Sequence, residues 1–453
     1  MITELVARQR AYFDTGATRP LGVRLAALEN LQKAVRQNEA KLCAALCEDL
    51  NKSSMEAYMT EVGIVLDELR FALRHFPQWA RVQAVPTPLV QFHAKSYVMP
   101  EPYGVALILA PWNYPFQLSM TPLIGALAAG NCAVVKPSAY APATSRAVSE
   151  LIAGCFDPAY VAVIEGGREQ NQALLQEKFD YIFFTGSVEV GKLVMESAAK
   201  HLTPVSLELG GKSPVIVDRT ADIPLAAKRI VFGKLVNAGQ TCVAPDYVLA
   251  EEAVHDKLLA ALRAAMEVSF PGGDMSAFPT IVNQKHFERV KRLLDSGSLY
   301  YGGETDETRR LIRPAILDRV SPGDPVMQEE IFGPILPVLT YKELGEAIAF
   351  VNARPRPLAL YLFTTDAAAE KQVLQSVRFG GGCVNDTIMH VASPHLGFGG
   401  VGESGMGSYH GKKSFDTFTH YKSIVKKSNW IDLPMRYQPY GKRAERLVRM
   451  FLK

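Results

Sequence analysis

The sequence has few cysteines and no long apolar run. Six cysteines in 453 residues, with no CxxC pair among them, are too sparse for a disulfide framework, so we expect free thiols. No stretch approaches the roughly 18 consecutive apolar residues that a membrane span needs. The longest runs, Val105–Ala110 and Leu123–Ala129, have a length typical of a buried core. Glu4, Arg8 and Arg10 stand where a secretory signal would be apolar, so we expect a cytoplasmic protein.

Net charge is also small, and it is unevenly distributed. The 49 Lys and Arg residues and 46 Asp and Glu residues give a net charge of +3. Residues 421–453 carry nine basic and two acidic side chains, a net of +7, which leaves −4 for the rest of the chain. Nucleic-acid binders are typically basic throughout, so we expect no nucleic-acid partner. The charge pattern predicts a mildly acidic body followed by a basic tail at 431–453.

The tail has the pattern of a basic amphipathic helix. Apolar side chains recur at helical spacing among Lys and Arg, namely Ala444, Leu447, Val448, Phe451 and Leu452. Two roles are open for such a helix. It could make weak contact with a membrane surface, or it could dock on its own subunit or across a dimer.

Hydrophobic periodicity predicts two α/β series after a helical start. The first 80 residues show helical periodicity through Leu21–Leu50 and Tyr58–Phe76, and prolines then flank an extended piece at Leu89–Met99. Short β-rich runs alternate with helices from there on, which predicts right-handed βαβ crossovers and mostly parallel sheets. The predicted strands are Val105–Ala110, Ala133–Val135, Val161–Ile164 and Tyr181–Phe184, then Val215–Val217, Tyr247–Ala250, Ile335–Leu339 and Leu360–Phe363. The glycine-rich stretch Gly380–Gly411 is expected to be mostly loop.

Two glycine motifs resemble nucleotide-binding patterns. The segment 186–193 (GSVEVGKL) follows an apolar strand, but Leu193 stands where a P-loop needs Ser or Thr to bind Mg²⁺. It still offers backbone N–H groups and a helix N-terminus to a diphosphate. The segment 397–402 (GFGGVG) matches GxGxxG without a preceding strand, so we interpret it as a tight loop.

Three further segments indicate one chemistry, and together they resemble a known family. They are residues 111–115 (PWNYP), 207–214 (LELGGKSP) and 239–242 (GQTC). The set resembles the aldehyde dehydrogenase superfamily over most of the chain. Agreement in the same order comes from 136–138 (KPS), 184–187 (FTGS), 330–334 (EIFGP) and 398–402 (FGGVG). Residues 243–247, 357–360 and 405–415 resemble the class 3 branch.

The resemblance implies an α/β fold with three parts and a tail. It places a Rossmann-like dinucleotide-binding lobe at 1–84 and 100–206 and an α/β catalytic lobe at 207–410. A small β oligomerisation arm is expected at 85–99 and 411–430. For class 3 types the resemblance implies a homodimer.

The resemblance also implies a thiol mechanism with Cys242 as the nucleophile. Hydride transfer from an aldehyde needs a tetrahedral intermediate, which a thiolate forms readily. A free cysteine of pKa about 8.5 is only about 3% thiolate at pH 7, so the site must lower this pKa or supply a base. In the family, Asn113 and the backbone N–H of Cys242 would hold the oxyanion, and Glu208 would activate the water that hydrolyses the thioester. Glu208 stands between two leucines, where an ionisable group is costly unless it is paired or used.

The cofactor residues follow from the same resemblance, which implies no metal. Lys136 would lie near the adenosine ribose and Glu330 on the nicotinamide ribose hydroxyls, with Phe332 against the nicotinamide. The full predicted set is Trp112, Lys136, Thr185, Gly186, Ser187, Gly191, Gly210, Glu330 and Phe332. One departure matters: many relatives continue Lys-Pro-Ser with a Glu that opposes a 2′-phosphate, and this sequence has Ala139. We therefore expect both NAD and NADP to be usable.

Other functions stay open at this point. A CoA-acylating aldehyde dehydrogenase would let a thiol attack the thioester, and Glu208 argues against it because that branch needs no base. A non-catalytic scaffold or a membrane-surface fatty aldehyde dehydrogenase would use the basic tail. For the expected enzyme, the class 3 resemblance implies medium-chain aliphatic or aromatic aldehydes as substrates, oxidised to carboxylic acids. Tyr114, Phe116 and the loop Thr387–Ser393 are the predicted walls of the substrate tunnel.

Overall fold

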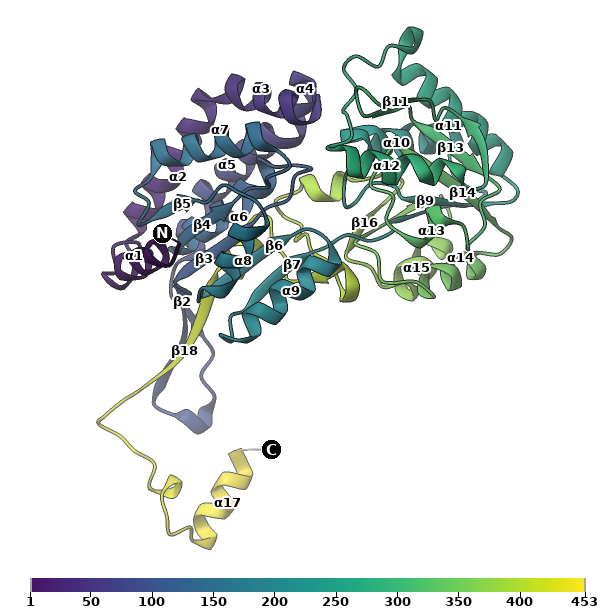
Figure 1. Cartoon of the computed structure of the whole chain (residues 1–453). Coiled ribbons are helices and arrows are strands. Elements are labelled where there is room, and N and C mark those ends of the chain that lie inside the picture. The colour runs from purple at the N-terminus through teal and green to yellow at the C-terminus, as the bar shows by residue number, and fades with distance from the viewer. Residues whose placement is uncertain (1, 452–453) are drawn as a thin grey trace.

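The computed structural model describes residues 2–451 and contains two α/β lobes, a β arm and a C-terminal tail (Figure 1). The first lobe runs from purple to teal in the figure and the second is green. The arm and the tail project from the first lobe. Two residues of the predicted tail helix, Leu452 and Lys453, lie outside the described residues. Between residues 2 and 451, no helix is both long and apolar enough to cross a membrane.

A six-stranded sheet forms the centre of the first lobe, in the order β17-β7-β6-β3-β4-β5. All neighbours are parallel except the antiparallel pair β17 and β7. Strands β3, β4 and β6 are buried at every position, as expected for parallel strands with both faces covered. The strands are β3 Val105–Leu109, β4 Cys132–Lys136, β5 Val161–Val163, β6 Tyr181–Thr185, β7 Val205–Glu208 and β17 Gly405–Met406.

Helices surround this sheet, and α6 (Gln117–Ala129) is buried along its whole length. It packs against α2, α5 and α16, and it ends at Gly130, whose left-handed φ of 98° closes the helix. The other helices of the lobe are α1 Ile2–Asp14, α2 Leu21–Gln37, α3 Glu39–Leu50, α4 Ser54–Ala57, α5 Gly63–Trp79, α7 Pro142–Cys155, α8 Arg168–Gln176, α9 Val188–Ala199 and α16 Lys412–Thr417. A π-helix, Tyr58–Val62, separates α4 from α5.

The second lobe is built on a seven-stranded sheet in the order β10-β13-β14-β9-β8-β15-β16. Only the pair β10 and β13 is antiparallel. Its strands are β8 Pro214–Val217, β9 Tyr247–Glu251, β10 Ser298–Tyr301, β13 Ala315–Asp318, β14 Ile335–Tyr341, β15 Ala359–Phe363 and β16 Gly381–Val384, with a separate pair β11 Thr305–Asp306 and β12 Leu311–Ile312. The helices are α10 Ile223–Leu235, α11 His255–Ser269, α12 Gln284–Arg292, α13 Pro325–Gln328, α14 Leu344–Asn352 and α15 Ala367–Ser376.

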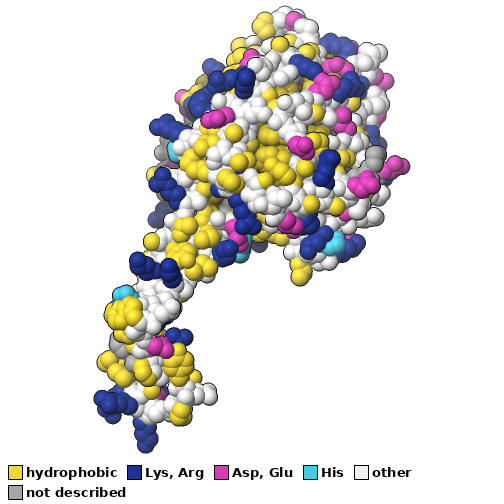
Figure 2. Space-filling view, turned by 90° about the vertical axis from the view of Figure 1, so that its left-hand side faces the viewer, with side chains coloured by type: hydrophobic (Ala, Val, Ile, Leu, Met, Phe, Trp, Pro, Cys, Tyr) yellow, Lys and Arg dark blue, Asp and Glu magenta, His cyan; other side chains and the backbone are white. Residues whose placement is uncertain are grey.

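The arm is a three-stranded antiparallel sheet in the order β1-β2-β18 (Figure 1). Strand β2 (Ala94–Pro102) pairs along its length with β18 (Thr419–Lys427), while the short β1 (Gln83–Val85) lies on its other side. Beyond it the tail leads to α17 (Lys442–Phe451), which lies apart from both lobes. Figure 2 shows Lys and Arg side chains around this end of the molecule.

All eight strands predicted from the sequence are present, and the helix predicted in the tail is α17. One difference is local: the extended piece predicted at Leu89–Met99 begins with a 3-10 helix, Leu89–Gln91, and its strand runs from Ala94 to Pro102. The other differences lie in long-range pairing. The predicted catalytic segment 207–410 also contributes to the first lobe, because β7 reaches Glu208 and β17 pairs with it. The predicted arm at 411–430 begins as a strand only at Thr419, since α16 packs on α6 and buries Phe415 in the lobe. The glycine-rich stretch 380–411 includes β16 and β17.

The contact between α6 and α16 leaves no room at Gly125. A Cβ there would lie 2.8 Å from the backbone oxygen of Ser414 and 2.9 Å from its Cβ. We expect Gly125→Ala to lower the free energy of unfolding by about 1–3 kcal/mol because the helices must separate. Gly154→Ala is the matched control, since a Cβ at that helical glycine meets no atom within 4 Å. It should leave stability unchanged or raise it by up to about 1 kcal/mol. Calorimetric Tm values compare the two, and equal Tm values would contradict the packing argument.

Candidate active site

The carboxyl edge of the first sheet gathers five of the predicted residues. Ligands of open α/β sheets bind beyond the carboxyl ends of the parallel strands. Trp112 and Asn113 follow β3, Lys136 ends β4, Thr185 ends β6 and Glu208 ends β7. Residues far apart in the sequence therefore meet at one edge, because the parallel register aligns their strand ends.

A cavity of about 290 Å³ opens beside Cys242. Apolar side chains from both lobes dominate its lining, including Tyr114 from the first lobe and Phe232 from α10. The predicted loop contributes as expected through Ile388 and its neighbours. The prediction is wrong for Phe116, which has no exposed surface and packs in the core of the first lobe.

The nucleophile loop has an unusual backbone. Asn237, Ala238 and Gly239 take left-handed φ angles of 54°, 52° and 72° just before Cys242. Such angles are unfavourable for the first two residues and persist only where the surroundings enforce them. The buried Gln240 does this: its side chain donates to the carbonyls of Asn237 and Thr280 and accepts from the N–H of Val282. At Gly239 a Cβ would lie 2.3 Å from the oxygen of Gly333, so only glycine fits.

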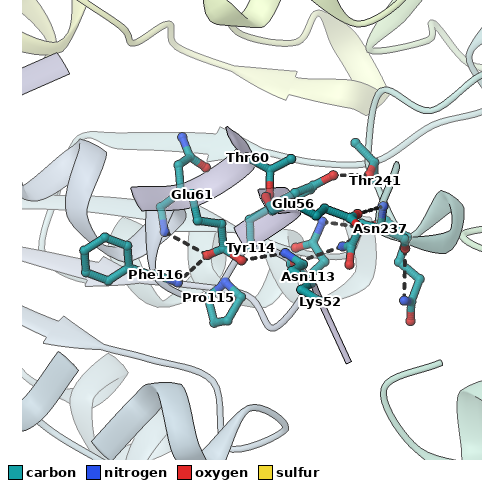
Figure 3. Close-up of polar contacts among 12 residues, drawn as sticks. Lys52, Glu56, Thr60, Glu61, Asn113, Tyr114, Pro115, Phe116, Asn237 and Thr241 are labelled. Atoms are coloured by element: carbon teal, nitrogen blue, oxygen red, sulfur yellow. Dashed lines mark hydrogen bonds and ion pairs between the residues drawn. The ribbon is translucent and has the colours of Figure 1, made fainter. Parts of the chain in front are cut away.

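Asn113 connects the first lobe to this loop. Its Nδ2 donates to the carbonyl of Gln240 at 3.0 Å, two residues before Cys242, and its own carbonyl accepts from Asn237 Nδ2 at 2.8 Å (Figure 3). A carboxamide has two N–H groups. The bond to Gln240 uses one and fixes the orientation of the side chain, so the other N–H can serve an oxyanion on Cys242. Next to it, Tyr114 Oη lies 2.5 Å from Thr241 Oγ1.

Glu208 is 2% exposed, and neither of its carboxylate oxygens has a hydrogen-bond partner among the described residues. Burial raises the pKa of Glu208 well above its usual range. Burial also raises the pKa of the Cys242 thiol, and the negative charges of Glu330 and Glu208 raise it further. The thiol is therefore protonated in the cofactor-free protein at neutral pH. The two carboxylates are suited to accept protons because they prefer the neutral form.

Glu330 lies close enough to Cys242 for its charge to act on the thiol, and hydrogen bonds to its backbone hold it in place. Burial, and secondarily the negative charge of Asp246, raises the pKa of Glu330 to about 8. Its carboxylate fills the space above Gly210, where a Cβ would lie 2.1 Å from Oε2. Its Oε1 is buried and has no partner among the described atoms, so it is free to accept from a ligand. Arg289 donates to the carbonyl of Glu330 at 3.1 Å and to that of Ile331 at 2.7 Å.

The glycine turn after β6 has the form of a phosphate-binding site. Ser187 caps α9 by accepting from the N–H of Val190. The N-terminus of α9 therefore begins directly beside Gly186, where a helix N-terminus can bind an anion. Gly191 lies close to Leu209: a Cβ there would lie 2.6 Å from Leu209 Cδ2, so a larger residue would displace that side chain. The Thr185 hydroxyl is buried without a partner among the described residues. These features fit a diphosphate in the groove that Ser187, Gly210 and Glu330 share.

The remaining predicted cofactor residues lie at the two ends of this region. Lys136 Nζ donates to the carbonyls of Pro137 and Gly166, and burial lowers its pKa to about 8. The rings of Trp112 and Phe332 meet edge to face, with centroids 5.3 Å apart. Phe332 has a φ of 48°, which turns the chain after Glu330. An adenosine end near Lys136 and a nicotinamide end near Phe332 are compatible with this arrangement.

Sequence reasoning missed the residues that support the site. Lys212 forms an ion pair with Asp246, which also accepts from the N–H of Ile331 at 2.9 Å. Lys212 Nζ further donates to the carbonyl of Glu329 at 2.8 Å. A lysine directly after two glycines between strands was the available signal. The sequence did not indicate a role for Lys52 and Glu61 near Asn113, because a Lys and a Glu in a helix-rich region are typical of a solvated surface.

The structure combines a two-lobed α/β fold with a cysteine in an apolar cavity and a glycine turn at a helix N-terminus, an arrangement compatible with a dehydrogenase. The chain belongs to the aldehyde dehydrogenase family, whose model matches residues 2–424. It is therefore an aldehyde dehydrogenase, an NAD(P)-dependent oxidoreductase.

Curated relatives and solved structures agree. The chain is 50% identical over 449 residues to the 4,4'-diaponeurosporen-aldehyde dehydrogenase of Staphylococcus aureus, covering 98% of this chain and 97% of the relative. It is 44% identical to human aldehyde dehydrogenase family 3 member B1, covering 98% and 96%. The substrate-bound Staphylococcus aureus AldH structure aligns over 100% of both chains with a TM-score of 0.98 and 48% identity. An NADP-dependent enzyme of E. coli aligns over 94% and 89%, with a TM-score of 0.86 and 25% identity.

The charges around Cys242 predict how its thiol reacts in the absence of cofactor. Because the pKa of Cys242 is raised, iodoacetamide labelling should keep rising from pH 7 to pH 9 with no plateau. At pH 9 Glu330 is mostly charged, since its pKa is about 8. Glu330→Gln then removes a negative charge and should speed labelling about threefold to tenfold, equivalent to about half to one pKa unit.

Mass spectrometry of the Cys242 peptide measures this labelling, and the exposed Cys47 in the same digest is the internal control. A plateau below pH 8, or equal rates in the variant and the parent, would contradict the electrostatic account.

Proposed function

We propose that the protein oxidises medium-chain aliphatic or aromatic aldehydes to carboxylic acids through a thiohemiacetal and a thioester on Cys242. The observation that carries this proposal is the hydrogen bond from Asn113 Nδ2 to the loop of Cys242, a cysteine that lines an apolar cavity. The unpartnered Glu208 carboxylate is close enough for its charge to raise the pKa of Cys242. The apolar lining favours an aldehyde with a hydrocarbon body. The Staphylococcus aureus relative is named as a 4,4'-diaponeurosporen-aldehyde dehydrogenase, which supports an aldehyde as the substrate class.

The first step is attack on the aldehyde. The Cys242 thiol gives its proton to a carboxylate, for which Glu208 and Glu330 are the nearby acceptors, and the sulfur forms a bond to the carbonyl carbon. The carbonyl oxygen becomes an oxyanion. The free N–H of Asn113 Nδ2 and the backbone N–H of Cys242 would stabilise it, since preorganised donors act most strongly where charge develops. An oxidised nicotinamide cofactor, when bound, would supply the acceptor for the hydride that leaves this carbon. As the hydride leaves, the oxyanion would re-form the carbon–oxygen double bond and give the thioester on Cys242.

The second step is hydrolysis of the thioester on Cys242. Glu208 takes a proton from water, the water oxygen bonds to the acyl carbon, and the carbon–sulfur bond breaks to release the carboxylic acid. A base works best when its pKa lies near the working pH. The raised pKa of Glu208 suits this role better than that of an exposed carboxylate would. A CoA-acylating enzyme, which delivers a thiol instead of water, has no use for such a base.

The cofactor proposal includes both NAD and NADP. Ala139 is exposed and carries no charge that would oppose a 2′-phosphate. Solved neighbours include an NAD-dependent aldehyde dehydrogenase of Sinorhizobium meliloti and the NADP-dependent E. coli enzyme. Both cofactors therefore occur among proteins of this fold.

Assembly and location are also proposals. The arm strands β2 and β18 present a sheet outside the lobes, which supports a homodimer in a cytoplasmic enzyme.

The tail helix α17 carries Lys442, Arg443, Arg446 and Arg449 and lies apart from both lobes, which supports weak contact with an anionic membrane surface. Vesicle co-sedimentation with and without residues 440–453 separates this role from docking within a dimer.

Removing the amide of Asn113 tests the mechanism. We expect Asn113→Ala to slow NADH formation from an aldehyde by about 10²–10³-fold, because an oxyanion donor is lost. Labelling of Cys242 by iodoacetamide should change little, which shows that the thiol remains accessible. Stopped-flow absorbance at saturating NAD⁺ gives the rate. A loss below threefold would contradict the role of Asn113.

A charge at position 139 tests the cofactor proposal. Ala139→Glu should lower kcat/KM for NADP⁺ at least about tenfold by like-charge repulsion and leave the value for NAD⁺ nearly unchanged. NAD⁺ with the same variant is the control for folding. An NADP⁺/NAD⁺ ratio below about 10⁻³ in the parent enzyme, or about 4 kcal/mol of discrimination, would contradict dual use.

A further inference from the structure

A fully buried ion pair lies directly behind Asn113. Lys52, in the short connection between α3 and α4, and Glu61, in the π-helix, have no exposed side-chain surface, and Nζ lies 2.5 Å from Oε1. Removing two charges from water is expensive, and replacing such a pair by apolar residues is often neutral or stabilising. Stability alone therefore gives no reason for the pair, and its contacts indicate what it does.

Both members of the pair hold the segment 113–117 by its backbone. Lys52 Nζ donates to the carbonyl of Asn113 at 3.0 Å and lies 4.2 Å from the ring centroid of Tyr114. Glu61 Oε2 accepts from the N–H of Phe116 at 2.9 Å and of Gln117 at 3.2 Å, at the start of α6 (Figure 3). The cation thus fixes one end of the segment and the anion fixes the other.

The π-helix explains how Glu61 reaches this position. A π-helix shifts the register of the residues that follow, and it is frequent at functional sites. One turn before Glu61, the Glu56 carboxylate accepts from the N–H of Asn237 at 2.6 Å. Asn237 in turn donates to the carbonyl of Asn113, so this carbonyl receives both Lys52 and Asn237. One short stretch of chain thereby orients both the oxyanion donor and the nucleophile loop.

We propose that the Lys52–Glu61 pair is a positioning device that fixes the backbone at Asn113 so that its side-chain N–H faces the oxyanion. The inference rests on the proposed role of Asn113. Neither side chain of the pair lines the cavity, so neither is a catalytic residue. Their direct contact with the oxyanion donor is the bond from Lys52 Nζ to the carbonyl of Asn113. Misplacement of a catalytic group by about 1 Å can reduce rates by about 10²-fold, which sets the scale of the expected effect.

The main test uses Lys52→Met with Glu61→Gln. The double variant removes both charges, so no lone buried charge is left, and the Gln oxygen can still accept from the N–H groups of Phe116 and Gln117. We expect the single-turnover rate of NADH formation to fall about 10-fold to 10²-fold at saturating substrates. The KM for NAD⁺ should stay within about twofold, since neither Lys52 nor Glu61 contacts a predicted cofactor residue. The labelling rate of Cys242 should also stay within about twofold, since Gln240 holds the nucleophile loop through its own bonds.

Asn113→Ala supplies the decisive comparison. If the pair acts through Asn113, adding the Lys52 and Glu61 substitutions to Asn113→Ala should slow the enzyme less than about twofold further, because the donor is already gone. Arg10→Met is the matched control: it breaks an ion pair with Asp180 in the same lobe, outside the site, and should lower Tm without changing the single-turnover rate.

Three results would overturn the inference. One is a parent-like rate in the Lys52 and Glu61 double variant. Another is a full additional loss in the Asn113→Ala background, which would show that the pair acts by another route. The third is a single-turnover rate that falls in proportion to Tm in both the double variant and Arg10→Met, because the rate would then report stability alone. A normal rate in Asn113→Ala alone would instead refute the proposed oxyanion role itself.

Discussion

The hydrogen bond from Asn113 Nδ2 to the carbonyl of Gln240 is the contact on which the site depends. It joins the end of β3 in the first lobe to the loop that carries Cys242, so this one contact fixes the proposed oxyanion donor relative to the proposed nucleophile. The loop can meet it only because Asn237 and Ala238 adopt left-handed backbone angles that Gln240 holds in place. The backbone strain is confined to this loop, and the hydrogen bonds of the buried Gln240 maintain it.

Burial also sets the protonation of the ionisable groups at the site. Burial raises the pKa of Glu208, of Glu330 and of the Cys242 thiol, so the thiol is protonated at neutral pH. The same burial raises the pKa of the carboxylates that accept protons. In the proposed mechanism, attack and hydrolysis both depend on this burial of ionisable groups at the site.

Much of this arrangement could be predicted from the sequence. The alternation of strands and helices predicted both parallel sheets, and short motifs pointed to Cys242, Glu208 and Asn113. Contacts between distant segments could not be predicted, because hydrophobic periodicity carries no information on pairing. The return of β17 to the first sheet and the packing of α16 on α6 are examples. The buried pair of Lys52 and Glu61 could not be predicted, because only the tertiary structure shows that these two charged side chains are buried and in contact.

The central claim is that Cys242 carries an acyl group that Glu208 releases with water. Glu208→Gln should trap this species, so the variant mixed with aldehyde and NAD⁺ and then quenched in acid provides the most direct measurement. Intact-mass and peptide analysis should show the added acyl mass on the Cys242 peptide, with none on the other five cysteines. An unmodified Cys242 peptide, or acyl mass on a different cysteine, would contradict the account.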